Sequence, residues 1–493
     1  MISAALLATL LLGLWLAARV RKRFSMPPGE WGWPILGHLP PSDEPMDETI
    51  KKLRKKHGDV FTWKIGTATF VVLCDFDTIK KVYNHPDAQG RPSFYSLLIF
   101  SCYKNLGLAN SVGEIWHGGR RFTIRHLRDM GMGRSSLESR IALEAHNLVE
   151  NFKKVTDVAT EVPRSLSIAI LNIIWELCAG KRHDLDDEKA LEFQQVVVDI
   201  FHDFQGNVVI FDTFPFLLPI TPRFVMEKLG VTKYMEDCDI LMSHMKKCIK
   251  EHKESLDVNN PRDYIDAFLI EMQLEKNAGS AIFTEENLMV SLGDIFTAAS
   301  EITSITLRWL ILYMIKHPEI QRKIQAEIDS VVPRDRLPGL DDRPSLSYLE
   351  ATLYEVERLV SVVPLLVPHC ATQDIEVNGF HVPKGTVLMG HAGSCHGDPQ
   401  VWQRPDEFYP PHFLDENGKF CPKKNGFIPF SIGRRVCPGE NLARQTMFLF
   451  GSALLQTFMF EAPEGEVLST QRDPAERMII IPKPFRVIMR QRS

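Results

Sequence analysis

The chain has 493 residues, of which 44% are apolar and 24% charged, a composition typical of a globular protein with a large buried core. Its formal net charge of -5 gives no bulk attraction to nucleic acid, and the sequence contains no zinc-type or helix-turn-helix pattern. The nine cysteines form no C-x-x-C pair, which disfavours a disulfide framework and indicates a reducing compartment.

The chain begins with an almost unbroken apolar run, Ile2 to Ala18, at the short end of the roughly 17 to 25 residues that a membrane-spanning helix needs. Basic residues follow this run and none precedes it. Residues 1–25 are therefore predicted to be a transmembrane signal-anchor with its N-terminus in the lumen and a basic stop on the cytosolic side. The alternative is a cleaved signal peptide, which normally carries its charges in front of the apolar stretch.

Residues 26–40 are rich in Pro and Gly and predict a stiff hinge, or an ordinary linker, after the anchor. Val60 to Cys74 alternates between apolar and polar residues with Gly66 in the middle, which predicts a β-hairpin. Phe94 to Val112 is apolar but aperiodic and predicts a loop over a cavity.

Arginines cluster between Arg120 and Arg134 against a single acidic residue, Asp129. Such a run is usually a solvated helix face. Farther along, residues 211–222 form an apolar, proline-rich patch that either packs in the core or dips into a bilayer. Residues 250–263 are predicted to be a polar connector.

A long apolar-periodic helix is predicted from the cap residue Thr284 to about Ile315, where His317-Pro318 ends it. The 32 residues from Thr284 to Ile315, at about 1.5 Å each, give roughly 48 Å, enough to cross a whole domain. A helix of this length and composition needs burial on several sides.

A second helix is predicted over residues 346–360, in which Glu355 and Arg358 share a face and can pair. On the surface such a pair contributes at most about 1 kcal/mol, whereas in the interior the loss of one partner is costly. Asn378-Gly379 between two short strands is a strong hairpin signal, and residues 387–389 are expected to join that small sheet. The tail, residues 472–490, is strand-like.

The most informative stretch runs from Phe430 to Gly439 and precedes another apolar-periodic helix. Glycines on both sides of Cys437 let the backbone bend around the sulfur and approach a flat cofactor. A helix opening at Pro438 would direct its N-terminal dipole at the sulfur and favour the thiolate. The simplest alternative is a structural cysteine in a glycine-rich turn.

The stretch matches F-x-x-G-x-R-x-C-x-G at every fixed position: Phe430, Gly433, Arg435, Cys437 and Gly439. On these residues the chain resembles the cytochrome P450 superfamily of haem-thiolate monooxygenases. His412, where the family usually has Arg, resembles the microsomal, family 2-like clan. The resemblance implies a single catalytic domain over residues 41–493 with a mostly α fold and small β-sheets (α+β). Haem is expected between the long oxygen-side helix and the cysteine loop.

The resemblance also implies roles for individual residues. Cys437 would be the axial ligand of haem b, and Glu355 with Arg358 would form a buried network behind the cysteine loop. The expected propionate contacts are Trp116, Arg120, His369 and Arg435. The candidate substrate contacts are Asp294, Ala298, Ile302, Val363, Leu366 and Val367.

The oxygen-side motif departs from the family pattern. Glu301 is followed by Ile302, where the family usually has a threonine whose hydroxyl steers protons to dioxygen. The next hydroxyl, on Thr303, points about 100° away around the helix. The candidate proton relay is therefore Glu301 with Ser300 or Thr303.

The resemblance implies insertion of one atom of O2 into a lipophilic small molecule, a steroid, fatty acid, terpenoid or xenobiotic. Electrons would come from NADPH-cytochrome P450 reductase, with cytochrome b5 as a further candidate donor, and the arginine cluster would dock the reductase. We expect a monomer on the endoplasmic reticulum membrane, facing the cytosol, without a nucleic-acid partner. Two alternatives stay open: a reductase-independent lipid hydroperoxide isomerase or dehydratase, suggested by Ile302, and a non-catalytic haem-binding protein.

Overall fold

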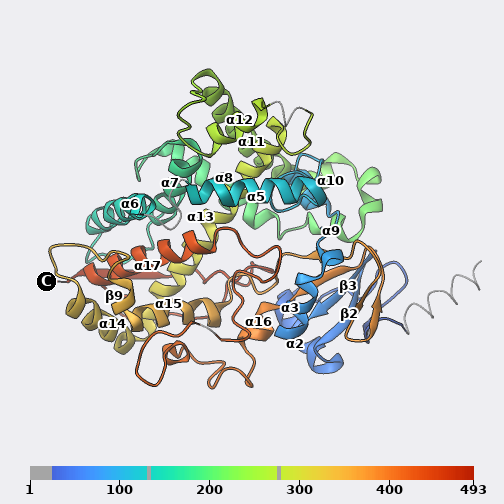
Figure 1. The fold of residues 1–493 in the computed structure, drawn as a ribbon. Helices are drawn as coiled ribbons and strands as arrows, with labels where there is room; N and C mark the ends of the chain where they lie inside the picture. The colour runs from blue at the N-terminus through green and yellow to red at the C-terminus, as the bar shows by residue number, and fades with distance from the viewer. Residues whose placement is uncertain (1–24, 130–134, 275–278, 423, 493) are drawn as a thin grey trace, which may run out of the picture.

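The computed structural model describes residues 25–129, 135–274, 279–422 and 424–492. Helices fill most of the body, and the sheet that contains β2 (Val60–Ile65) and β3 (Ala68–Leu73) lies with helices α2 (Met46–His57) and α3 (Phe76–Asn84) at its lower right in Figure 1. The expected mostly α fold with small β-sheets is therefore confirmed. The predicted anchor in residues 1–25 lies outside the described residues except at its last position.

Helix α13 (Glu285–Lys316) runs through the middle of the helical part (Figure 1). It begins as predicted, because the Thr284 side chain accepts a hydrogen bond from the backbone N–H of Asn287 at 3.1 Å. In the described part of the chain it is the one helix long and apolar enough to cross a membrane, and 67% of its apolar stretch is buried. Its burial is that of a core helix.

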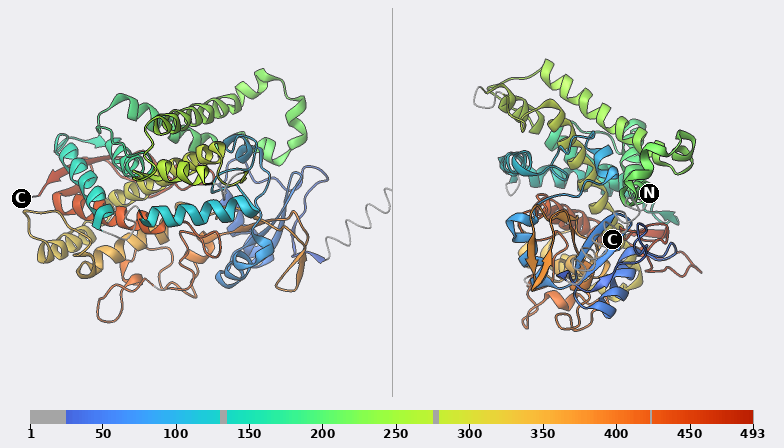
Figure 2. Two further views of the ribbon diagram at one scale, coloured as in Figure 1. Left: turned by 45° about the horizontal axis from the view of Figure 1, so that its top comes forward. Right: turned by 90° about the vertical axis from the view of Figure 1, so that its right-hand side faces the viewer.

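Other helices pack around α13 on two sides (Figures 1 and 2). The first group is α5 (Gly113–Asp129), α6 (Ser135–Lys153), α7 (Ser165–Ala179), α8 (Glu188–Asp203), α11 (Val231–Glu254) and α12 (Tyr264–Gln273). The second is α14 (Pro318–Val331), α15 (Ser347–Val360) and α17 (Glu440–Thr457). Because α11 continues to Glu254 with His252 buried, the predicted connector was wrong for residues 250–254.

The largest sheet has the strand order β1-β2-β3-β8-β5. Its strands are β1 (Gly29–Glu30), β2 (Val60–Ile65), β3 (Ala68–Leu73), β8 (Val387–Gly390) and β5 (His369–Cys370). The predicted β2–β3 hairpin is confirmed, with Gly66 at a φ of 55° in its turn.

The predicted hairpin at Asn378-Gly379 is also confirmed, as β6 (Ile375–Val377) and β7 (Phe380–Val382). The expectation that residues 387–389 join it was wrong. Strand β8 is buried along its whole length and pairs instead with β3 in parallel and with β5. The third sheet joins β4 (Thr160–Glu161), β10 (Arg486–Gln491) and β9 (Phe458–Glu461), so only the end of the strand-like tail is a strand.

Short helices complete the described fold. Residues 94–112 are not all loop, because α4 (Tyr95–Phe100) lies within them. The predicted apolar patch forms α9 (Val209–Thr213) and η2 (Pro215–Ile220), and α10 (Arg223–Lys228) follows it. The remaining short elements are η1 (Pro86–Ala88), η4 (Arg343–Ser345), α16 (Ala392–His396) and η5 (Pro410–Phe413).

Candidate active site

The loop from Phe430 to Gly439 closes on itself before α17. The backbone N–H of Cys437 donates to the carbonyl oxygen of Phe430 at 2.9 Å. Gly433 has a φ of 85°, and a Cβ at this position would collide with the carbonyl oxygen of Tyr83. A glycine is therefore required here on both conformational and steric grounds. Helix α17 begins at Glu440, two residues later than predicted.

Opposing effects act on the Cys437 sulfur. Burial raises the pKa of its thiol, whereas the backbone N–H groups of Gly439 and Glu440 and the charge of Arg120 lower that pKa. Two amides aimed at the sulfur from the start of a helix are suited to a thiolate, the form in which cysteine binds a metal.

Beside this loop lies an arginine with unusual surroundings. Arg435 is 7% exposed, and its Nη2 donates to the carbonyl oxygen of Ser111 at 2.7 Å. Its guanidinium lies over the ring of Trp116, 4.1 Å from the ring centroid. Its buried Nε has no hydrogen-bond partner among the described residues.

Two further arginines approach the same place. Arg120 donates from Nη2 to the carbonyl oxygen of Val436 at 2.5 Å. Arg91 donates from Nε to the carbonyl oxygen of Ala109 and from Nη1 to that of Pro368, both at 2.8 Å. Sequence reasoning missed Arg91, because a single arginine in a loop carries no pattern.

These arginines raise one another's electrostatic energy. Burial is the main cause that lowers the pKa of Arg91 to about 10 and of Arg435 to about 8, and mutual repulsion adds to it. Their hydrogen bonds to described residues all go to backbone carbonyl oxygens. Three guanidinium groups without a carboxylate bonded to them fit an anionic group such as the propionates of haem.

His369 lies close to the same arginines. Its ring stacks on Tyr83 with centroids 3.9 Å apart, and its Nδ1 bonds to the carbonyl oxygen of Ala88 at 2.8 Å. Burial, together with Arg91 and Arg435, lowers the pKa of His369 to about 2. The structure thus brings close to one another the four residues predicted to contact the propionates: Trp116, Arg120, His369 and Arg435.

A hollow separates this loop from the centre of α13. It is lined by Ile302, Thr303, Thr306, Glu357, Ser361, Val362, Val363, Pro429, Phe430, Ala443 and Met447. Ala298 is exposed, and Ile295, Ala299 and Ile302 are half-buried, although α13 is otherwise mostly buried. These positions share one helix face, so that face of α13 borders open space.

Comparisons with known proteins agree with this geometry. The family model described as Cytochrome P450 matches residues 27–489. The chain belongs to the cytochrome P450 family. It is 44% identical to cytochrome P450 2L1 of Panulirus argus, over 96% of each chain. It is also 37% identical to cytochrome P450 2E1 of Mus musculus, over 92% of this chain and 90% of the relative.

Membership makes this P450 a monooxygenase of the haem-thiolate type. The family also implies a redox partner and a lipophilic substrate.

The three candidate relay residues of this P450 do not lie together. Glu301 is buried and accepts a hydrogen bond from Gln194 Nε2 of α8 at 3.2 Å, and burial raises the pKa of its carboxyl. Ser300 is fully buried, and its hydroxyl donates to the carbonyl oxygen of Phe296 at 3.0 Å. Only Thr303 lines the hollow.

The candidate substrate contacts also divide. Ala298, Ile302 and Val363 border the open space. Asp294 instead accepts the backbone N–H groups of Leu108 and Ala109, at 2.5 and 3.0 Å. Its carboxylate holds the loop that also bonds the arginines.

Two other predicted substrate contacts lie away from the hollow. Leu366 is buried in the apolar cluster of the large sheet, where Tyr83 and Leu388 also lie. Val367 is 50% exposed, and its carbonyl oxygen accepts from Arg91. Successive side chains of an extended segment point to opposite sides. The sequence alone did not show which of the side chains after Val363 face the hollow.

Behind the cysteine loop, Glu355 and Arg358 form a buried pair. Arg358 donates to both carboxylate oxygens of Glu355, at 2.8 and 2.7 Å. Its remaining donors reach the carbonyl oxygens of His396, Pro405 and Glu407. The Nδ1 atom of His412 lies 3.2 Å from both carboxylate oxygens of Glu355. The pair thus fastens α15 to the segment that leads into the loop.

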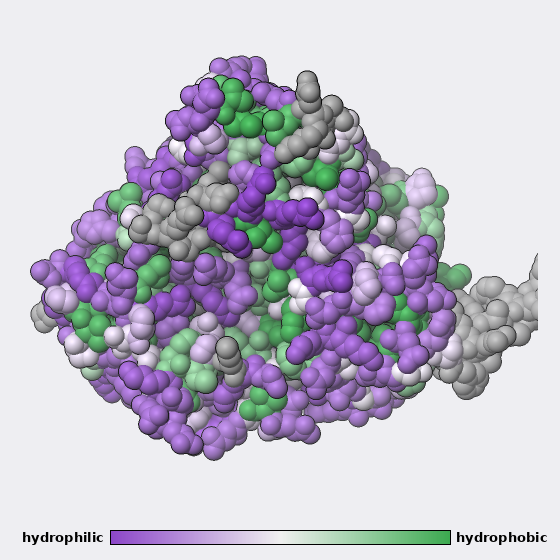
Figure 3. All heavy atoms as spheres, in the orientation of Figure 1, coloured by the Kyte–Doolittle hydropathy of each residue, from purple (hydrophilic) through white to green (hydrophobic). Residues whose placement is uncertain are grey.

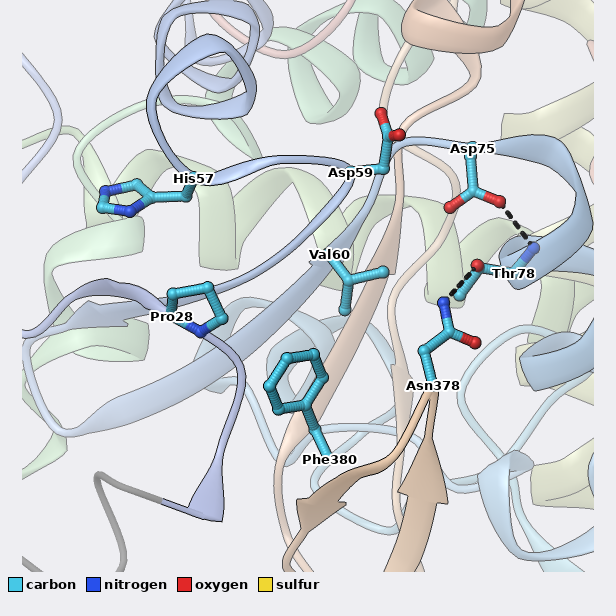
Figure 4. Close-up of a pocket in the computed structure, with 8 residues that line it drawn as sticks. All are labelled: Pro28, His57, Asp59, Val60, Asp75, Thr78, Asn378 and Phe380. Carbon is cyan, nitrogen blue, oxygen red and sulfur yellow. Dashed lines mark hydrogen bonds between the residues drawn. The ribbon is translucent and has the colours of Figure 1, made fainter.

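A second hollow, of about 440 Å³, lies by the hinge (Figure 4). It is lined by Pro28, His57, Asp59, Val60, Asp75, Thr78, Asn378 and Phe380. None of the predicted site residues lines it. Within it, Asp75 accepts the backbone N–H of Thr78, and Asn378 donates to the Thr78 hydroxyl. His57 and Asp59 instead bond Glu30 and Arg54, which do not line the hollow.

Proposed function

We propose that Cys437 binds the iron of haem b and that this P450 inserts one atom of O2 into a lipophilic small molecule. The cofactor, when bound through a thiolate, supplies the activation of dioxygen. The observation that carries the proposal is the convergence of three arginines beside the cysteine loop: Arg435 lies in the loop, Arg120 donates to the carbonyl oxygen of Val436, and Arg91 and Arg435 both donate to that of Ala109. Steroids, fatty acids, terpenoids and xenobiotics are the candidate substrate classes.

The chain's own residues would hold and shield the cofactor. The three arginines, with Trp116 and His369, would bind its propionates, and Gly433 and Gly439 would let the backbone approach its face. Ala298, Ile302 and Val363 would contact the substrate and exclude water from the reacting side.

Thr303 is the residue best placed to donate a proton into the hollow, which is the side on which the substrate would react. Its side chain lines the hollow next to Ile302, whereas Glu301 is turned to Gln194. We infer that Thr303 Oγ1 donates to the reacting side and is reprotonated from solvent. Glu301 would then position α8 over α13.

The apolar outer surface supports attachment to a membrane. Ile220 and Phe224 are 71% and 61% exposed, and Figure 3 shows apolar side chains at the right-hand edge over α10. The backbone N–H of Thr67, in the turn between β2 and β3, donates to the carbonyl oxygen of Thr213 at 3.0 Å. This hydrogen bond joins the apolar patch of residues 211–222 to the largest sheet. With residues 1–25 as anchor and 26–40 as hinge, domain 41–493 would lie on the cytosolic face of the endoplasmic reticulum and take substrate from the lipid.

Electrons would arrive at the opposite, cysteine side. Arg128 is exposed on α5, and Arg434 is exposed in the cysteine loop. Arg125 is also exposed, but it pairs with Glu271 at 2.8 Å. A positive surface next to the sulfur would attract an acidic NADPH-cytochrome P450 reductase, or cytochrome b5, and speed their association. A monomer suffices for this arrangement.

The test uses the full chain in lipid bilayers with purified reductase. We expect oxygenated product that requires NADPH, reductase and O2 together. The second candidate function, suggested by Ile302, predicts turnover of a lipid hydroperoxide without reductase. Reductase-independent turnover with no NADPH-dependent product would favour that function, and haem without either activity would leave only a binding protein.

A further inference from the structure

A buried side-chain contact joins the end of α8 to the loop formed by residues 472–481. Glu476 is 8% exposed. One of its carboxylate oxygens accepts from Gln205 Nε2 at 2.7 Å, and the other lies 2.8 Å from His202 Nδ1. Gln205 Oε1 in turn accepts the backbone N–H groups of Met478 and Ile479, both at 2.8 Å. The Gln205 carboxamide therefore uses both of its ends to bind this loop.

The loop itself is held firmly at other points. Arg472 pairs with Asp47 of α2 and donates from Nη2 to the carbonyl oxygen of Glu476 at 2.9 Å. The backbone N–H of Ile480 donates to the carbonyl oxygen of Val362 at 2.9 Å, beside the hollow. Loop 472–481 is thus a fixed frame, and α8 is the element that the Gln205 contact fastens to it.

The contact lies between the inside and the outside of the molecule. On its inner side, Ile480 bonds the segment that lines the hollow, and Met478 packs on the cluster around Leu365. On its outer side, the chain leaves Gln205 for α9 to α10, where Ile220 and Phe224 are exposed. A ligand that travelled between α8 and the loop, from the apolar surface to the hollow, would have to separate Gln205 from Glu476.

We propose that Gln205 and Glu476 form a latch that closes this passage, and that its opening sets how fast lipophilic ligands reach and leave the hollow. This inference rests on the proposed function, because it assigns the hollow to haem and substrate. Helix α8 ends at Asp203, so opening needs only side-chain separation and a local shift of residues 204–208. Lids of this kind open on microsecond to millisecond times and often limit turnover.

Three variants test the latch. Gln205→Glu places two carboxylates against each other, and Glu476→Gln removes the charge that Gln205 and His202 bind. The exchanged pair Gln205→Glu/Glu476→Gln restores complementarity, because the carboxylate now at position 205 can still accept the two backbone N–H groups and the carboxamide now at position 476 can donate to it. Gln195→Glu, which introduces the same change elsewhere on α8 beside Asp199, is the matched control.

The measurement is stopped-flow absorbance of the ferric full-length enzyme in bilayers, mixed with a bulky triaryl imidazole or with imidazole itself. We expect Gln205→Glu to raise both the association and the dissociation rate constants of the bulky ligand about tenfold, with the dissociation constant within about twofold. The rates for imidazole, and those of the Gln195→Glu control, should not change. The exchanged pair should return the bulky ligand to wild-type rates.

Hydrogen exchange of the amides of Met478 and Ile479 gives a readout that needs no cofactor. It should be faster in Gln205→Glu and should return to the wild-type rate in the exchanged pair. Faster exchange with unchanged ligand rates would overturn the latch and leave a purely structural contact. Wild-type protein that binds no haem would instead overturn the proposed function, and this inference with it.

Discussion

Arg435 lies over the ring of Trp116, with its guanidinium carbon 4.1 Å from the ring centroid, while its Nε bonds to no described residue. A buried guanidinium with an unsatisfied donor costs free energy unless an anion completes its hydrogen bonds. The aromatic ring supplies part of the compensation, and an anionic ligand would supply the missing hydrogen bond. The buried Arg435 therefore strengthens the binding of an anionic cofactor and lowers the stability of the cofactor-free protein.

This relationship predicts opposite effects of Arg435→Leu on cofactor retention and on the cofactor-free protein. We expect haem loss to accelerate at least tenfold, because a charge-assisted hydrogen bond worth roughly 1.5 to 3 kcal/mol is removed. The cofactor-free form should melt at a higher temperature, because a desolvated charge is gone. Haem transfer to a globin that lacks haem measures the first effect, and thermal melting measures the second. Arg434→Leu, an exposed neighbour, should change neither.

The proposed ligand role of Cys437 predicts a spectroscopic change. Cys437→Ala should abolish the ferrous-CO absorption band typical of thiolate ligation, because no other sulfur lies in the Phe430–Gly439 loop. Cys421→Ala, at an exposed cysteine, should leave the band in place. A normal band in Cys437→Ala would place the ligand elsewhere in the chain.

The buried pair of Glu355 and Arg358 predicts a large loss of stability from a single change. Glu355→Gln leaves the Arg358 charge with only carbonyl partners and should destabilise the protein by roughly 3 to 5 kcal/mol. Glu48→Gln breaks a surface pair with Lys51 and should cost less than about 1 kcal/mol. Chemical denaturation of both variants measures the contrast. Equal losses would mean that the buried network carries no special weight.

Asp294 predicts a pH dependence. Burial raises the pKa of its carboxyl to about 6, above the ordinary value near 3.9 in an unfolded chain. Between these values the folded state binds more protons, so the contribution of Asp294 to stability falls as the pH rises from about 4 to 6. A shift of this size corresponds to at most roughly 3 kcal/mol.

Asp294→Asn keeps an oxygen that can accept from Leu108 and Ala109 but cannot ionise. Its melting temperature should therefore gain on that of the wild type as the pH rises through this range. Parallel melting curves for the two proteins from pH 4 to pH 7 would contradict the raised pKa.

Features written in a few adjacent residues could be predicted from the sequence. The cap at Thr284, the turn at Asn378-Gly379 and the glycines of the cysteine loop each act over a handful of positions, and the structure contains all three as structural features. Their physical causes are local hydrogen bonds and backbone sterics, so no knowledge of the fold was needed.

Features that depend on distant partners could not be predicted in this way. Strand β8 pairs with β3, more than 300 positions earlier in the numbering, and Gln205 meets Glu476 across a separation of 271 residues. Arg91 and Asp294 owe their surroundings to a loop that both bond. In each case the packing of the whole domain determines which residues meet, and no periodic pattern in the sequence indicates these contacts.

The residue next to Glu301 allows a test of how protons reach the reacting side. Ile302→Thr places a hydroxyl on the face of α13 that borders the hollow, and we expect a larger fraction of NADPH electrons to end in product rather than in hydrogen peroxide. Thr303→Val should shift the same fraction in the opposite direction, because it removes the hydroxyl that lines the hollow.

Thr297→Val, on the buried side of the helix, is the control and should not alter the fraction. The ratio of product to NADPH consumed, measured at saturating substrate with reductase, decides the matter. If Thr303→Val keeps the wild-type ratio, protons arrive without Thr303. If Ile302→Thr also leaves the ratio of product to NADPH unchanged, Ile302 does not limit proton delivery, as expected of an enzyme that rearranges peroxides.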